Sequence, residues 1–424
     1  MPRLVVTFAV LALMYNSAHA ADSAWSQWRG PGRDGHSAET GIVTDWTGNQ
    51  PKLLWQVKGL GEGYSSVSIA DGRIFTTGNV SDGQAVIARK LSDGSPVWST
   101  TLTDKAPKHG KGGARCTPSI DGDHVYVILS EGTVACLKAA DGTVVWKKNC
   151  GKDFGGKMMS GWGFSESPLV DGDRVVVTPG GKDAGLVALD KMTGKEIWRS
   201  AIPAGGKKGR DGAGYSSVVI SNACGVKQYV QLMGRGVVSV RADNGKFLWQ
   251  YNRVANGVAN ISTPVVSGDY VFCSTGYGTG SALVKLEASG DTGVSAEEVY
   301  FLDSKTLQNH HGGMVLVGDH IYCGHQHNAG FPICVEMKTG KVVWGGKIRG
   351  PGTGSAAVLY IDGHLIFRYQ NGVVALIEAS PNGYKLKGSF KPAYQKGSTW
   401  AHPVVLDGKL YLREQNQLMC YEVK

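Results

Sequence analysis

Residues 188–198 read Ala-Leu-Asp-Lys-Met-Thr-Gly-Lys-Glu-Ile-Trp, a Thr-Gly turn followed by a β-rich run that ends in tryptophan. Similar turn-and-strand segments occupy residues 139–146 and 337–344, and further copies end at Trp98 and Trp249. Tyr300 takes the position of the tryptophan that is missing between residues 249 and 344. The copies recur about every 50 residues, and four short strands per repeat of ~40–50 residues are typical of a β-propeller blade.

A second repeated motif lies between these segments and marks the start of each unit. It is a short apolar run, a Gly turn and another apolar run, which predicts a hairpin. Its clear copies occupy residues 117–122, 167–172, 263–268 and 403–408, and weaker copies start at Ser66, Ser217, Gly313 and Ala356. Eight copies predict an all-β, eight-bladed propeller. The last unit lacks its fourth strand, which Lys52–Gln56 would supply, so that the N-terminal part of the chain closes the ring.

Composition excludes several protein classes. The 424 residues include 61 glycines and 42% hydrophobic residues, which is inconsistent with disorder and consistent with many turns. No run of ~18 apolar residues follows the N-terminus, so we expect no membrane span. There is no C-x-x-C motif, so neither a zinc ribbon nor an attached haem is expected.

The first twenty residues predict export. Arg3 precedes an apolar run at residues 4–14, and Ala18-His19-Ala20 is a typical signal-peptidase site. We therefore expect a signal peptide at residues 1–20, cleaved after Ala20, an N-terminal extension at 21–49 and the propeller at 50–424. The protein would be periplasmic or secreted, and we expect a monomer that does not bind nucleic acid.

The cysteines follow the repeat rather than a disulfide framework. Cys136, Cys334 and Cys420 align with Ala188, a position for a small residue, so buried free thiols are expected. Cys323 and Cys334 lie on neighbouring strands of one blade, where a cross-strand bridge stays open as an alternative.

The segment Ala188–Trp198 resembles the docking motif of the PQQ-like, or quinoprotein-alcohol-dehydrogenase-like, propeller family. The opening Trp25-Ser26-Gln27-Trp28-Arg29-Gly30-Pro31-Gly32-Arg33-Asp34-Gly35 is similar to the start of an exported bacterial subfamily. The resemblance implies two kinds of function. Catalytic quinoproteins carry pyrroloquinoline quinone (PQQ) and Ca²⁺ in the propeller funnel, whereas the BamB-like branch of the family binds protein partners. The vicinal cysteine pair of the catalytic branch is absent from this sequence.

Strand alternation divides the loops between two rims. The short Asp-Gly and Thr-Gly turns share one rim, and the long, dissimilar loops share the other, where binding sites on repeat scaffolds concentrate. Loops 103–115, 151–163 and 201–213 carry nine Lys or Arg residues against three Asp. This rim is predicted to attract an anionic small ligand or an acidic surface of an envelope protein. Solvated lysines on flexible loops are the alternative interpretation.

Six residues are predicted to surround the funnel mouth, because they lie just before the first strands of their blades or in the same loops. Aromatic side chains with a cation suit a flat anionic ligand such as a quinone cofactor, although packing between blades is the alternative for the tyrosines. Glu166 is a weak candidate for a general base or a metal ligand, and a hydrogen-bonding role in its loop is the alternative. The funnel-mouth residues are Tyr64, Arg115, Trp162, Tyr215, His311 and Trp400.

Blade six has an unusual concentration of histidines, at His310 and His311 in one loop and at His325 and His327 in the next. If residues 325–327 are extended, both of their imidazoles lie on one face, which favours a divalent metal such as Zn²⁺. Hydrogen bonding within the loops is the alternative. We therefore predict an exported ligand- or protein-binding scaffold first and a PQQ-dependent dehydrogenase with PQQ and Ca²⁺ second. The sequence leaves open whether the protein is an enzyme.

Overall fold

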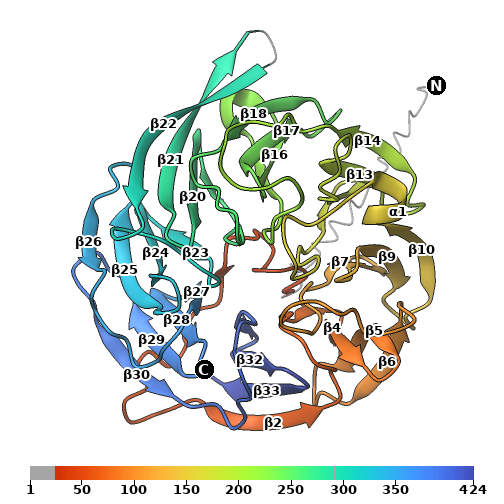
Figure 1. Cartoon of the computed structure of the whole chain (residues 1–424). Helices are drawn as coiled ribbons and strands as arrows, with labels where there is room; N and C mark the ends of the chain where they lie inside the picture. Colours follow the sequence, from red (N-terminus) through yellow and green to blue (C-terminus); the bar gives the residue numbers. More distant parts are fainter. Residues whose placement is uncertain (1–23, 291–292) are drawn as a thin grey trace, which may run out of the picture.

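The chain forms a ring of eight β-sheets, which confirms the eight-bladed propeller (Figure 1). The computed structural model describes residues 24–290 and 293–424, so the expected signal peptide and cleavage site lie outside the described residues. Seven sheets have four strands and one has five. In the described part of the chain, helical structure is limited to α1 (Cys150–Phe154) and the 3-10 turn Ala223–Gly225. No described helix is long and apolar enough to cross a membrane.

Each blade is an antiparallel meander, and its four strands are called A to D from the ring axis outward. The strands are, in blade 1, β3 (Ser68–Ala70), β4 (Arg73–Val80), β5 (Gly83–Lys90) and β6 (Pro96–Thr101); in blade 2, β7 (Ser119–Asp121), β8 (His124–Ile128), β9 (Thr133–Lys138) and β10 (Val144–Asn149); in blade 3, β11 (Leu169–Asp171), β12 (Arg174–Val177), β13 (Leu186–Asp190) and β14 (Glu196–Ser200); and in blade 4, β15 (Val219–Ser221), β16 (Gln228–Met233), β17 (Gly236–Arg241) and β18 (Phe247–Tyr251). They continue, in blade 5, as β19 (Val265–Ser267), β20 (Tyr270–Thr275), β21 (Gly280–Ser289) and β22 (Gly293–Asp303); in blade 6, as β23 (Met314–Val317), β24 (His320–His325), β25 (Phe331–Glu336) and β26 (Val342–Gly345); in blade 7, as β27 (Ala356–Ile361), β28 (His364–Tyr369), β29 (Val374–Glu378) and β30 (Leu386–Phe390); and in blade 8, as β31 (Val404–Leu406), β32 (Lys409–Glu414), β33 (Gln417–Glu422) and β2 (Lys52–Lys58).

The N-terminal strand β2 closes the ring, as the sequence predicts. It pairs antiparallel with β33, from Lys52 opposite Glu422 to Lys58 opposite Gln417. Blade 8 thereby gains its fourth strand from the opposite end of the chain. Pairing of β2 with β33 removes an edge that would otherwise expose unpaired backbone groups.

The small residues of the repeat lie between two large side chains within a blade. In blade 2, Cys136 is opposite Tyr126 on one side and Trp146 on the other, and all three are buried. All eight cysteines are free thiols. Cys323 is opposite Ile333 whereas Cys334 is opposite Tyr322, so the two cysteine side chains point to opposite faces of the sheet and no bridge forms.

Four of the repeated tryptophans, Trp55, Trp98, Trp146 and Trp198, pack against the glycine of the C–D turn in the next blade. Trp146 Nε1 donates to Lys191 O at 2.9 Å, and its ring leaves no room for a side chain on Gly194, where a Cβ would lie 2.7 Å away. Gly194 has a φ of +68°, which suits glycine. In all eight blades the register between strands C and D shifts at this position. The bulge turns the aromatic side chain toward the neighbouring blade.

Residues 24–37, called the plug segment below, cross the axial channel (red in Figure 1). Trp25 exchanges backbone hydrogen bonds with Ile69 in blade 1, at 2.8 and 3.0 Å. At the other end, β1 (His36–Ser37) pairs in parallel with β27 and makes the fifth strand of blade 7. Between them, Arg33 donates to Val218 O of blade 4 at 2.9 Å and to Ser167 O of blade 3 at 2.7 Å. The plug segment therefore ties opposite sides of the ring together.

Candidate functional site

A cavity of about 350 Å³ lies on the ring axis, on the rim that carries the long loops. Its wall is made by the loops that enter the blades and by the B–C loops, as strand alternation predicts. The plug segment separates it from a second hollow at the other end of the channel, because Trp28 lines the first while Arg29 and Arg33 line the second. The cavity is thus a cup that opens on one rim only.

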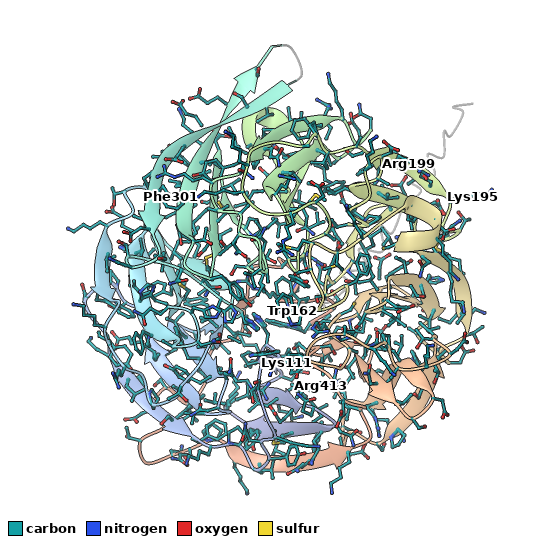
Figure 2. All side chains as sticks on the ribbon, viewed as in Figure 1. Lys111, Trp162, Lys195, Arg199, Phe301 and Arg413 are labelled. Carbon is teal, nitrogen blue, oxygen red and sulfur yellow. The ribbon has the colours of Figure 1, made fainter. Side chains whose placement is uncertain are left out.

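The six residues predicted for the funnel mouth all line this cavity, and their role in binding stays a prediction. Tyr64 packs against Trp400 with ring centroids 4.6 Å apart, and the Arg115 guanidinium lies 5.6 Å from the Tyr64 ring. Across the cup, Trp162 stands edge-on to Tyr215 at 5.8 Å. The tyrosines therefore pack between loops and face the cavity at once. Figure 2 shows Trp162 and Lys111 near the ring centre, with Lys195 at the perimeter.

Among the described residues, Arg115 carries a charge that no carboxylate neutralises. Burial lowers the pKa of Arg115 to about 10, and the groups that partly offset this are the hydroxyls of Tyr64 and Tyr215. Its guanidinium donates to the backbone carbonyls of Gly110 at 2.9 Å and Lys111 at 2.5 Å. Four other arginines have a pKa lowered by burial to about 10 or 9, and each has an Asp or Glu side chain nearby that partly offsets the effect of burial: Arg29 with Asp34, Arg33 with Glu166, and both Arg368 and Arg413 with Glu414.

The cavity wall is rich in neutral hydrogen-bonding groups. It includes no Asp or Glu among the described residues that line it. Burial lowers the pKa of His311 and of His402 to about 3 and also lowers that of His310 and His327. These four imidazoles are therefore neutral at pH 7, and the positive charge of the cup comes from Arg115 and Lys111.

The structure brings together three of the four histidines predicted as metal ligands, and their role in metal binding stays a prediction. His310 contacts His311 and His327, with ring centroids 3.7 and 3.9 Å apart, but His325 is fully buried and its Nδ1 accepts from Gln308 N at 3.2 Å. No group of three or more His, Cys, Asp or Glu side chains in the described part of the chain is arranged to hold a metal ion.

The expectation that residues 325–327 are extended is wrong. β24 ends at His325, and Gln326 has a φ of +66°, so the chain turns there. Because alternation of side chains holds only in an extended strand, the two imidazoles do not share a face. His327 instead lines the cavity, where His325 does not.

Glu166 lies outside the cavity wall. Its side chain is buried, and its Oε2 accepts from Thr178 N at 2.9 Å, which holds the loop onto the neighbouring strand of blade 3. Burial raises the pKa of Glu166 to about 8, and the nearby Arg33 guanidinium partly opposes this rise. Glu166 thus makes a hydrogen bond within its blade and does not line the cup, and its role as a general base or metal ligand stays a prediction.

Two further features of the cup are absent from the predicted site, although the second involves residues that begin the repeated hairpin motif. Tyr277 lines the wall with a φ of +56°, a conformation that is strained for a bulky residue and recurs at functional sites. A belt of side-chain hydroxyls links the first strands of five neighbouring blades. In it, the backbone N–H of each residue donates to the hydroxyl of the next, at 2.9–3.1 Å, through Ser66, Thr117, Ser167, Ser217 and Thr263.

The hydroxyl belt ends at blade 6, where Gly313 takes the equivalent position. A Cβ on Gly313 would lie 3.3 Å from the His402 ring and close to Arg29, and its φ of +68° also favours glycine. Arg29 donates from this gap to Met314 O, and Trp28 packs edge-on against His402 at 5.4 Å. The plug segment thus reaches the cup where the belt is interrupted, in the blade whose hairpin motif begins with Gly313.

Comparisons with solved structures show the same architecture. BamB from Moraxella catarrhalis superposes with a TM-score of 0.61 at 14% identity, over 88% of this chain and 98% of that one. Quinohemoprotein alcohol dehydrogenase from Comamonas testosteroni superposes with a TM-score of 0.65 at 12% identity, over 94% and 80%. A europium-containing methanol dehydrogenase gives 0.53 at 12% identity, over 92% and 89%. At such identities the likeness shows the fold alone.

Sequence comparison gives the family. A search of curated proteins found no match to this sequence. The family model PQQ_2, described as outer membrane protein assembly factor BamB, matches residues 105–346, which is more than half of the chain. The protein therefore belongs to this BamB-like family of PQQ-type β-propellers.

Proposed function

We propose that the protein is an exported binding scaffold of the cell envelope, and that its cup holds an anionic group of a ligand or partner. The observation that carries this proposal is the Arg115 charge in a cavity wall without carboxylates. A cation held in a partly desolvated site is stabilised by an anion that enters it, and such charge-assisted hydrogen bonds are among the strongest in proteins.

The surroundings of the cup support the same proposal. Lys111 lies on its wall, and the exposed side chains of Lys207, Lys208 and Arg210 extend the positive charge along the rim. An electropositive rim raises the local concentration of anions and speeds their arrival. The family description names an outer-membrane assembly factor, which agrees with export and with a binding role in the envelope.

The dehydrogenase alternative requires PQQ with Ca²⁺, and the described lining of the cup does not fit this pair. Ca²⁺ prefers six to eight oxygen ligands, with carboxylates prominent among them. The cup offers Asn328 and Gln370 but no Asp or Glu, and Glu166 is engaged outside the wall. The donor chemistry therefore favours a binding role over quinoprotein catalysis.

The test compares two charge variants of the protein that starts at residue 21. Arg115→Gln removes the charge in the cup, and Lys195→Gln removes a charge from the opposite rim. Thermal unfolding is followed in sodium sulfate and in sodium chloride of equal ionic strength. Sulfate stabilises proteins generally by exclusion, which all three proteins share. We expect an additional sulfate-dependent rise in Tm in the wild type and in Lys195→Gln, with more than half of it lost in Arg115→Gln.

Equal sulfate effects in all three proteins would contradict the proposal. Reconstitution with PQQ and Ca²⁺, followed by dye reduction with alcohols, tests the alternative. Turnover well above that of a control without cofactor would replace the binding scaffold by a dehydrogenase. We expect no such turnover, because the lining lacks carboxylate ligands for the calcium ion.

A further inference from the structure

The polar groups of the cup are suited to a ligand that has many hydroxyl groups. His310 Nε2 and His327 Nδ1 are buried in its wall and have no hydrogen-bond partner among the described residues. Buried polar atoms are nearly always paired in native proteins, so two such nitrogens at one wall point to groups that a ligand brings. Asn328 and Gln370 stand on the same wall, and an amide both donates to and accepts from a hydroxyl.

The aromatic rings of the cup do not form one flat face. Neighbouring rings stand at angles from 36° for Tyr64 with Trp400 to 86° for Tyr277 with His310. Trp28 and His402 meet at 66°. Such a curved wall suits a non-planar molecule, whose weakly positive C–H groups pack against the negative faces of several rings. A planar aromatic acid would gain less from it, because stacking requires a surface parallel to the ligand.

The closed end of the cup limits what part of a ligand can enter. Trp28 of the plug segment lines the cavity, while the neighbouring Arg29 and Arg33 are anchored to carbonyls of blades 3, 4 and 6. A chain molecule therefore cannot pass through the ring axis at this point. The volume of about 350 Å³ is at the low end of the ~300–1,000 Å³ range of ligand pockets, enough for one or two sugar rings.

We propose that the cup recognises the end of an acidic carbohydrate, with a terminal sugar whose carboxylate or sulfate group faces Arg115. The inference rests on the proposed function and names its ligand class. Arg115 binds the acidic group, and the aromatic rings pack against the sugar. The hydroxyl groups of the sugar form hydrogen bonds with His310, His327, Asn328 and Gln370. The terminal sugar ring contacts Trp28 at the closed end of the cavity.

Isothermal titration calorimetry with a matched set of ligands tests this assignment. Methyl glucuronoside and methyl glucoside differ in the acidic group alone, glucose 6-sulfate replaces the carboxylate by sulfate, and 2-naphthoate is a flat acid without hydroxyls. We expect glucuronoside or the 6-sulfate to bind at least ten-fold more tightly than the glucoside and the naphthoate. The stronger of the two acidic sugars identifies which anion the site prefers.

Three variants locate the site. Arg115→Gln is expected to weaken binding of the acidic sugar by ten-fold or more. Arg115→Lys should weaken it by less, because lysine keeps the positive charge but loses the planar guanidinium that can donate two parallel hydrogen bonds. Trp28→Ala should weaken it without abolishing the preference for acid. Lys195→Gln is the control on the opposite rim and should bind as the wild type does. If Arg115→Gln fails to fold, Lys111→Gln removes the other positive charge of the cavity wall from an exposed position and should also weaken binding of the acidic sugar.

The possible outcomes separate this inference from the proposed function. If naphthoate binds as tightly as the acidic sugars and Arg115→Gln weakens its binding, the carbohydrate assignment is wrong. The proposed anion-binding scaffold would then remain. If the glucoside binds as tightly as the glucuronoside, the inference that the ligand is an acidic sugar is wrong. Binding of none of the acids to folded wild-type protein overturns both proposals. An oligosaccharide with an internal uronic acid should bind more weakly than one with a terminal uronic acid. Equal affinity of the two oligosaccharides would contradict a cavity that is closed at one end by Trp28.

Discussion

At the residue scale, the environment of the cup decides the charge of each side chain. His402 is buried beside Trp28, and burial together with the Arg29 charge lowers its pKa to about 3. In the unfolded chain the pKa of a histidine is about 6.5. Between these two values the unfolded state binds a proton that the folded state does not, so the folded protein loses stability as the pH falls below about 6.5.

This linkage gives a prediction for acid stability. The unfolding free energy of the wild type should decrease from pH 6.5 toward pH 4, and each such histidine contributes a slope of at most about 1.4 kcal/mol per pH unit. His402→Gln removes one site of proton uptake, so its slope should be shallower even if its stability at pH 7 is lower. Urea unfolding at several pH values measures this. His364→Gln, on the opposite rim, is the control, and an equal change of slope in both variants would contradict the prediction.

At the scale of a strand, the outer edge of each blade is fixed by its aromatic residue. Trp146 of β10 is nearly fully buried and bonds to the next blade, whereas the adjacent Val145 is exposed to 39%. The register shift between β9 and β10 separates the two side chains, because it turns one inward and leaves the other on the surface.

Replacing the two residues in turn should give very different results. Trp146→Ala removes the packing against Gly194 and the hydrogen bond to Lys191 O, and we expect it to lower the free energy of unfolding by about 3–5 kcal/mol. Val145→Ala should change it by less than about 0.5 kcal/mol, as is usual on the surface. Chemical denaturation of both variants measures the difference. Similar losses would show that the outer strand is not held mainly by the blade-to-blade contact.

At the scale of the whole molecule, residues 24–58 serve two separate purposes. The plug segment, residues 24–37, closes the axial channel, and β2 closes the ring through β33. The plug segment closes one end of the cavity. Strand β2 covers the edge of β33 and thereby completes the ring of blades.

Two truncations separate these purposes. A chain that starts at residue 38 should remain a folded β-protein with a lower Tm, because Arg33 no longer bonds to blades 3 and 4. A chain that starts at residue 59 also loses β2, and its exposed β33 edge should make it aggregate. Circular dichroism and size-exclusion chromatography follow both. A monomeric, folded chain from residue 59 would show that the ring does not need this closure.

The blade number, the closing strand and the rim that carries the cup can all be predicted from the sequence. These follow from short-range signals: Thr-Gly and Asp-Gly turns, alternation along strands and an aromatic residue, in most repeats tryptophan, at one position of each repeat. Alternation also placed Tyr64, Arg115, Trp162, Tyr215, His311 and Trp400 at one end of the ring, and the structure brings all six to one cavity.

Which side chains line the cup depends on tertiary contacts that the repeat pattern does not specify. The turn at Gln326 separates His325 from His327, the hydrogen bond to Thr178 keeps Glu166 out of the wall, and the plug segment brings Trp28 to the floor from the far end of the chain. Each outcome depends on contacts between residues distant in sequence or on the backbone angle of a single loop residue. A periodic pattern specifies neither, because it records only what the blades have in common.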